Sequence, residues 1–203
     1  MSSKNLLVDY IPFEVTKEQI NESMSKNDGR LVVKGTLQRA EAKNQNGRVY
    51  PKETLMREAK KYAQVQIKER RALGELDHPD SSVVNLNNVS HNILEMHWNG
   101  DDLSGTVEVL GTPAGNILKE LFKAGIKLGI SSRGLGSVKE MMGEGGETLE
   151  VQPDFELIAF DFVSNPSTHG AFLSPVNESK GSKTGVNKYN NINRIITDII
   201  TEF

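Results

Sequence analysis

Cysteine is absent from this chain of 203 residues. Without a thiol, the protein can form neither a disulfide framework nor a thiolate metal site, and it has no cysteine nucleophile. A disulfide-stabilised scaffold and a cysteine hydrolase are therefore excluded. We expect an intracellular protein.

An excess of positive charge is also missing. The formal net charge is −3 at pH 7, and the basic residues form no clusters. Nucleic-acid binding that is driven by counterion release needs a positive surface. Nucleic acid is therefore not expected as a main partner.

Long hydrophobic runs are missing as well. The first apolar run ends at Asp9 and is too short for a signal peptide. No stretch approaches the length of a membrane span. We expect a soluble protein that is not secreted and does not bind membranes.

The chain is long enough for one domain with a hydrophobic core. Residues 1–30 hold a strand-like apolar run and then a polar stretch, which is either a linker or a short exposed helix. Compact folding is expected to begin at residue 31, and residues 31–176 are predicted to form the domain. Residues 177–203 are predicted to be a polar linker that ends in a short amphipathic helix at 195–200.

Turn and cap signals indicate the main elements. Two alternating runs, 89–98 and 103–110, meet at Asn99-Gly100, which is a strong signal for a β-hairpin. Thr112-Pro113 supplies an N-cap and a first-turn proline for a helix that ends at Gly125. Further strands are predicted at 31–37, 126–130 and 155–163, and a second helix is predicted to open at Pro51. Because strands outnumber helices and the clearest connection is antiparallel, we predict an α+β fold with a mostly antiparallel sheet or small barrel flanked by helices.

Four histidines are candidates for a general base. His78 lies in the segment Gly74-Glu75-Leu76-Asp77-His78-Pro79, beside a turn that would expose the ring. His91 and His97 fall on the polar side of a predicted strand, so we expect both at the solvated surface. His169 is expected in a surface loop, with a role as a second active-site histidine as the alternative.

Candidate nucleophiles lie in the segment Gly129-Ile130-Ser131-Ser132-Arg133-Gly134-Leu135-Gly136-Ser137. A serine becomes a nucleophile at neutral pH when an imidazole within hydrogen-bond reach takes its proton. Ser131 is expected at a strand end beside glycines that permit tight turning. Alternation places Ser131 and Ser132 on opposite sides of the strand and does not choose between them, and Ser137 also competes. A simple turn built of serines and glycines is the alternative.

Two charged residues complete the candidate site. Arg133 either steadies an oxyanion, directly or by fixing backbone donors, or receives an acidic substrate side chain. Asp161 lies in the most apolar predicted strand, and a buried carboxylate needs a partner. We therefore expect Asp161 to orient His78, with capping of the following turn as the alternative. Glu75 is the rival for the orienting role.

Three segments together resemble the prohead core proteases of large contractile-tailed phages, which are maturation proteases of the T-even type. They are the two segments quoted above and Asn44-Gln45-Asn46-Gly47-Arg48-Val49-Tyr50-Pro51. The resemblance implies a fold similar to the herpesvirus assembly protease and a serine endopeptidase that digests the scaffold and trims capsid proteins before DNA packaging. It implies that residues 31–176 are the protease domain.

The resemblance also assigns roles within the site. It implies that Ser131 is the nucleophile and His78 the base, and Asp161 matches an aspartate of the family's late strand. Ser132, Arg133 and Gly134 are then the candidates for contacts to the oxyanion or the substrate. No cofactor and no metal are needed, and the sequence has no ligand spacing typical of a metal-dependent hydrolase.

Members of this family cut after Glu when Leu or Ile stands two residues earlier, and they process themselves. Two such strings, 20–22 and 200–202, lie in the presumed tails, where we expect trimming. Two others, 73–75 and 93–95, are expected to be protected by folding.

Partners and location follow from the same resemblance. The expected substrates are scaffold or core proteins and capsid proteins, met inside the assembling prohead in the host cytoplasm. A homo-oligomer is an expectation by analogy alone. The alternative function is an inactive scaffold or capsid-interaction module that has kept the fold.

Overall fold

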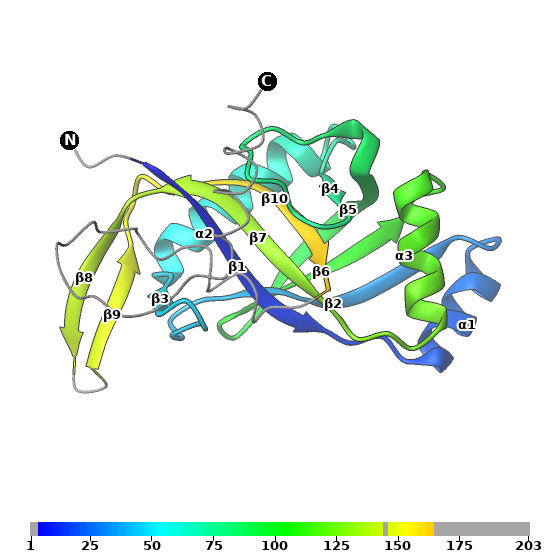
Figure 1. Cartoon of the computed structure of the whole chain (residues 1–203), viewed down its shortest axis with the longest axis horizontal. Coiled ribbons are helices and arrows are strands. Elements are labelled where there is room, and N and C mark those ends of the chain that lie inside the picture. Colours follow the sequence, from blue (N-terminus) through cyan, green and yellow to red (C-terminus); the bar gives the residue numbers. More distant parts are fainter. Residues whose placement is uncertain (1–3, 144–145, 165–203) are drawn as a thin grey trace, which may run out of the picture. The chain divides into compact units, whose positions relative to one another are not determined.

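The computed structural model describes residues 4–143 and 146–164 (Figure 1). His169, the predicted linker and the predicted terminal helix lie outside these residues. In the described part the strands are β1 (Asn5–Phe13), β2 (Leu31–Arg39), β3 (Arg48–Val49), β4 (Leu73–Glu75), β5 (Val89–Asn99), β6 (Asp102–Val109), β7 (Leu128–Gly136), β8 (Val138–Gly143), β9 (Gly146–Val151) and β10 (Glu156–Val163). The α-helices are α1 (Lys17–Lys26), α2 (Lys52–Tyr62) and α3 (Pro113–Lys123), with a π-helical turn at Ala63–Ile67 and a 3₁₀ turn at Leu86–Asn88.

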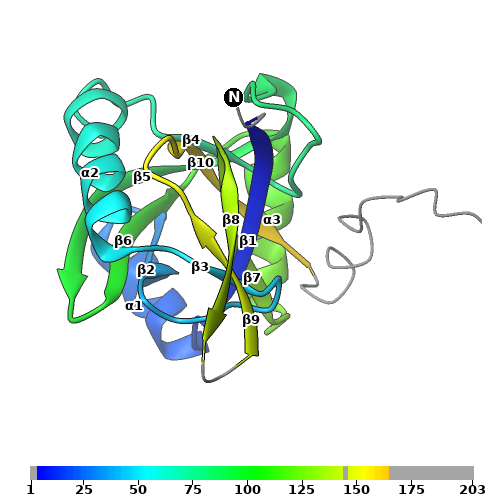
Figure 2. The same cartoon turned by 90° about the vertical axis from the view of Figure 1, so that its left-hand side faces the viewer.

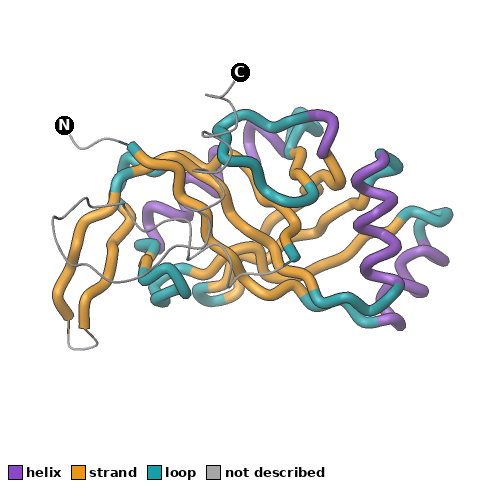
Figure 3. The backbone as a smooth tube through the Cα atoms, viewed as in Figure 1, coloured by secondary structure: helices purple, strands orange, loops and turns teal. Residues whose placement is uncertain are grey.

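Two antiparallel sheets surround the core. One has the order β1-β7-β10 and the other the order β2-β6-β5-β4. A parallel bridge between Leu76 and Phe162 connects the end of β4 to β10, and β1 lies against β2 at the other side. A third small sheet has the order β3-β9-β8. Helices and strands both contribute to the fold (Figure 3), and most strand pairs are antiparallel, so the predicted α+β class is confirmed.

Aromatic side chains from distant parts of the sequence form the centre of the core. The rings of Phe13 and Phe122 each contact Phe162 edge to face, at centroid distances of 5.1 and 5.4 Å. Such pairs add to the stabilisation from burial of apolar area. Phe122 lies on α3, which is in contact with α1 (Figures 1 and 2). The core therefore joins β1, β10 and α3.

The N-terminal residues belong to this core. β1 pairs with β7 along its whole length, and Leu7 and Phe13 are buried. The polar stretch after β1, which the sequence predicted to be either a linker or a short exposed helix, contains the helix α1. Its N-cap Thr16 and Gln19 form a capping box. Ile20 of α1 is buried in the main core. The sequence predicted that compact folding begins at residue 31. In the structure it begins earlier, with β1.

The hairpin and the helix after it are confirmed. β5 and β6 pair in antiparallel fashion around the turn at Gly100, where φ is 61°. Thr112 caps α3 through its side chain, which accepts a hydrogen bond from the Gly115 amide. Gly125, with φ of 75°, follows the helix as a C-terminal glycine should.

The surface position predicted for His91 is wrong. A register shift in β5 between Ile93 and Glu95 reverses the faces of the strand, so that His91 is fully buried while His97 is exposed as predicted. The two ring nitrogens of His91 lie 2.8 Å from Ser90 Oγ and 2.9 Å from Phe160 O. Burial lowers the pKa of His91 to about 4, so its ring is neutral at physiological pH.

Candidate active site

Ser131 lies in the middle of β7, not at a strand end as the sequence predicted. It pairs with Tyr10 of β1 and with Asp161 of β10. The glycines of this segment make room for aromatic rings instead of turns: a Cβ on Gly129 would come within 1.5 Å of the Tyr10 ring. Ser131 is 1% exposed, and within the described residues its Oγ makes no hydrogen bond.

The two adjacent serines face opposite sides of β7. Paired residues on neighbouring strands share a face, so Ser131 lies on the face of Asp161, and Arg133 follows two residues later on that face. Ser132 points the other way, where its Oγ accepts a hydrogen bond of 2.7 Å from Gln38 Nε2. The hydroxyl of Ser132 therefore has a structural partner, whereas that of Ser131 has none in the described part.

His78 follows β4 in a turn beside β10. Asp77, with φ of 63°, adopts the left-handed conformation that aspartate tolerates, and its amide donates to Phe162 O at 2.7 Å. β10 therefore separates the His78 segment from β7. Two strand spacings amount to about 10 Å between the backbones of the two segments. The approach of the His78 side chain to Ser131 stays a prediction.

A buried ionic cluster connects these elements. Arg133 Nη2 donates to Glu75 Oε1 at 3.0 Å and to Asp161 Oδ1 at 3.2 Å, and Arg133 Nε lies 2.9 Å from Asp161 Oδ2. All three side chains are fully buried. Burial raises the pKa of Asp161 to about 6, against the lowering effect of the Arg133 charge.

These contacts redefine two sequence predictions. Asp161 is buried and paired, as the apolar strand required, but the partners that the structure shows are Arg133 and the Glu75 amide, at 2.9 Å. Its role in orienting His78 stays a prediction, and so does that of Glu75. The Arg133 guanidinium has internal partners, which argues against direct contact with a substrate and favours the support of nearby backbone.

A second buried cluster lies on the opposite face of β7, and sequence reasoning missed it. Asp9, which pairs with Ser132, accepts hydrogen bonds from Asn46 Nδ2 and Arg48 Nη1, both at 2.8 Å, and from the Tyr50 hydroxyl. An aspartate inside an apolar strand was the signal that could have revealed it. The polar residues Asn46, Arg48 and Tyr50 of the segment 44–51 are therefore the hydrogen-bond donors to this buried carboxylate.

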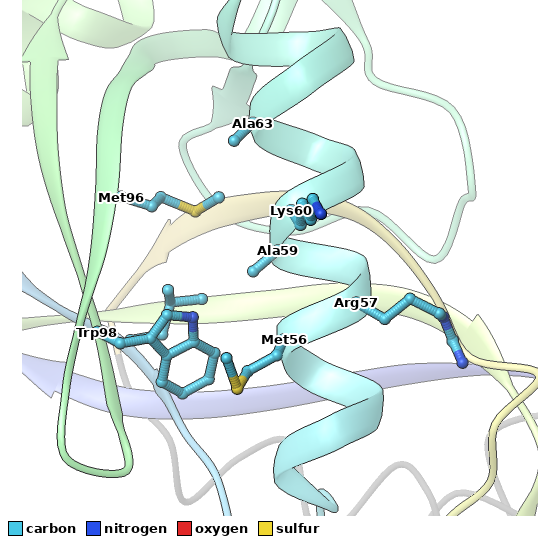
Figure 4. Close-up of a pocket in the computed structure, with 8 residues that line it drawn as sticks. Met56, Arg57, Ala59, Lys60, Ala63, Met96 and Trp98 are labelled. Carbon is cyan, nitrogen blue, oxygen red and sulfur yellow. The ribbon is translucent and has the colours of Figure 1, made fainter.

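A separate pocket of about 340 Å³ lies between α2 and the β5–β6 hairpin (Figure 4). The side chains of Met56, Met96 and Trp98 line it, and Lys60 lies at its side. Among the described residues, its lining is mostly apolar, with Arg57 and Lys60 as the charged members. In the described part of the chain, no helix is long and apolar enough to span a bilayer.

Comparison with known proteins gives one consistent result. Residues 6–181 match the family model described as prohead core protein serine protease. The prohead core protein protease of Enterobacteria phage T4 is 35% identical over 148 residues, which cover 71% of this chain and 68% of that protein. The solved structure of the bacteriophage T4 capsid assembly protease matches with a TM-score of 0.70 at 29% identity, and the match covers 81% of this chain and all of that one. The chain therefore belongs to the prohead core protein serine protease family.

Proposed function

We propose that this protein is a serine endopeptidase that cleaves scaffold or core proteins and capsid proteins inside the assembling prohead, in the host cytoplasm. Membership of the family and the names of the matching T4 protein and the matching T4 structure support the protease role and the phage substrates. The single observation that carries the assignment of the site is the hydroxyl of Ser131, which has no hydrogen-bond partner among the described residues. Ser131 lies on the central strand β7, and only β10 lies between this strand and the His78 segment.

In this mechanism Ser131 Oγ attacks the carbonyl carbon of the scissile peptide while His78 takes the hydroxyl proton. The tetrahedral intermediate collapses, the C–N bond breaks, and His78 gives the proton to the leaving amine. Water then hydrolyses the acyl-enzyme with the same base. Asp161 is the proposed carboxylate partner of this pair, and its contacts to Arg133 add a cation to the arrangement.

The mechanism also needs a contact to the oxyanion. Ser132, Arg133 and Gly134 are the proposed residues, and all three pair with β1 and β10 on both edges of β7. Backbone amides that are engaged in a ladder are not free to bind an oxyanion. A contact from one of these residues therefore requires local opening of β7 when the substrate binds.

Burial of Ser131 also favours the second candidate, an inactive scaffold or capsid-interaction module. At 1% exposure the hydroxyl is closed to a peptide in this conformation. Local movement that admits a peptide is part of the first proposal, whereas the second requires that no such movement occurs. Cleavage assays on the purified full chain therefore separate the two candidates.

The adjacent serines allow a sharp test. We expect S131A to lose scaffold cleavage by at least ~10³-fold, because removal of the nucleophile leaves only binding and electrostatic effects. We expect S132A to keep cleavage within about threefold, because alanine keeps the backbone amide that is proposed for the oxyanion contact. We expect it to lose ~1 to 3 kcal/mol of stability, because the buried Gln38 amide loses its acceptor. The assay follows fragments of purified scaffold protein by mass spectrometry. Full cleavage by S131A rejects the nucleophile assignment, and absence of cleavage by the wild-type chain favours the inactive module.

The same fragments test the proposed specificity, cleavage after Glu with Leu or Ile two residues earlier. One predicted self-cleavage site needs correction, because residues 20–22 lie in α1 and not in an extended tail. Ile20 is buried and Glu22 pairs with Lys26, so α1 would have to unfold before cutting. The predicted site at 200–202 lies outside the described residues.

A further inference from the structure

We propose that Arg133 is a positioning residue whose guanidinium holds the segment that carries His78 against the strand that carries Ser131. This inference rests on the proposed function for the roles of His78 and Ser131. It goes beyond that function because it assigns to Arg133 a task that neither serine chemistry nor substrate binding requires.

The contacts of Arg133 bracket His78 in the sequence. Nη2 donates to Glu75 Oε1 at 3.0 Å, three residues before His78, and Nη1 donates to Ser81 O at 2.7 Å, three residues after it. One guanidinium therefore pins both ends of the turn. Because Arg133 stands two residues after Ser131 on the same face of β7, it links this turn directly to the strand of the nucleophile.

The carboxylates extend the connection to β10. Asp161 Oδ1 accepts hydrogen bonds from Arg133 Nη2 and from the Glu75 amide, the latter at 2.9 Å, and its Oδ2 lies 2.9 Å from Arg133 Nε. Glu75 Oε1 also accepts from the Asn85 amide at 3.0 Å. These bonds join β7, β10 and both sides of the segment 75–85. Backbone bonds hold the start of this segment, at Leu76 and Asp77, and the arginine adds side-chain bonds on both sides of His78.

The chemistry of arginine suits this task. A planar guanidinium donates in several fixed directions at once, whereas a lysine ammonium is a single point of charge on a flexible stem. Arg133 is fully buried, so its geometry is set by its partners Glu75, Asp161 and the carbonyls of residues 81 and 83, and not by solvent. A small displacement of a catalytic group costs up to ~100-fold in rate, so such rigidity matters for catalysis.

A matched pair of buried arginines provides the experiment. In R133M we expect amide hydrogen exchange of residues 76–83 to become faster and kcat to fall by ~10- to 100-fold, with KM within about threefold. R48M removes the other arginine that is buried among the described residues, the partner of Asp9, and controls for general loss of stability. We expect it to leave exchange in residues 76–83 unchanged and kcat within about threefold. Both variants are compared at a temperature where circular dichroism shows them folded.

The outcomes separate the two proposals. Exchange is measured on S131A-background proteins as well, so the positioning role is tested even if the proposed nucleophile is wrong. Unchanged exchange in residues 76–83 of R133M overturns the inference, and so does an equal increase in R48M. If R133M does not fold, R133K keeps the charge without the fork, and we expect it to show the same faster exchange. Wild-type exchange in R133K, or failure of both variants to fold while R48M folds, rejects the positioning role.

Discussion

At some positions of this protein, neighbouring atoms restrict which residue type fits. Gly74, in the segment that leads to His78, is the clearest case: a Cβ there would come within 2.0 Å of Phe160 O and 2.2 Å of His91 Nε2. Both atoms belong to groups that cannot move aside, because the His91 ring and the Phe160 carbonyl contact each other. Only glycine allows β4 to pass so close to β10.

We therefore expect G74A to lose more than ~3 kcal/mol of unfolding free energy, at the upper end of the cost of overpacking. The matched control is G111A, because a Cβ at Gly111 would meet nothing within 4 Å, and its effect should stay within about 0.5 kcal/mol. Urea unfolding followed by circular dichroism measures both. Equal stability of G74A and the wild type would contradict the close approach.

At the scale of elements, the strongest local signals were the reliable ones. The Asn99-Gly100 turn and the Thr112-Pro113 cap depend on residues close in sequence, and both are confirmed. The bulges of β5 and β10 depend on the partner strands, so alternation in a single sequence cannot reveal them. That is why the buried position of His91 was missed.

Thr112 shows how one cap serves two elements. Its hydroxyl accepts from the Gly115 amide at 3.0 Å and donates to the Val89 carbonyl, so it joins the start of α3 to β5. We expect T112A to lose ~1 to 2 kcal/mol of stability, while T112S keeps both bonds and stays within about 0.5 kcal/mol. Chemical denaturation of the two variants measures the difference. A T112A protein as stable as T112S would show that the cap contributes nothing.

At the scale of the whole molecule, the candidate site depends on pairs that are far apart in the sequence. The resemblance pointed to Ser131, His78 and Asp161, but nothing near Arg133 in the sequence indicates that Glu75 is its partner. The same holds for Asp9 and Arg48. Charges of this kind become visible only when the strand order is known, which is why the roles of the two arginines could not be predicted.

Two buried groups give stability opposite dependences on pH. The pKa of His91 is lowered to about 4, so the unfolded chain takes up its proton first and stability is lost as pH falls from about 6.5 toward 4. The pKa of Asp161 is raised to about 6. Its contribution is present below about pH 3.8 and is lost as pH rises through 6, so the two effects partly cancel in the wild type.

Comparison with a variant isolates the His91 contribution. We expect the stability difference between the wild type and H91Q to shrink by ~2 kcal/mol between about pH 7.5 and about pH 5, because glutamine does not titrate. Urea unfolding at both pH values provides the measurement, with H97Q, at an exposed position, as the control. A difference that stays constant with pH would show that His91 is not held neutral.

The two charged clusters on opposite faces of β7 also bear on how the chain avoids mispairing. A slip of β7 by one residue reverses every side chain. Arg133 would then join Arg48 beside the single carboxylate of Asp9, while Asp161 and Glu75 would lose their cation. Such an alternative alignment would enclose unbalanced charge on both sides of the strand. The buried charges therefore favour the single alignment in which Ser131 lies on the face of Asp161 and Ser132 lies on the face of Asp9.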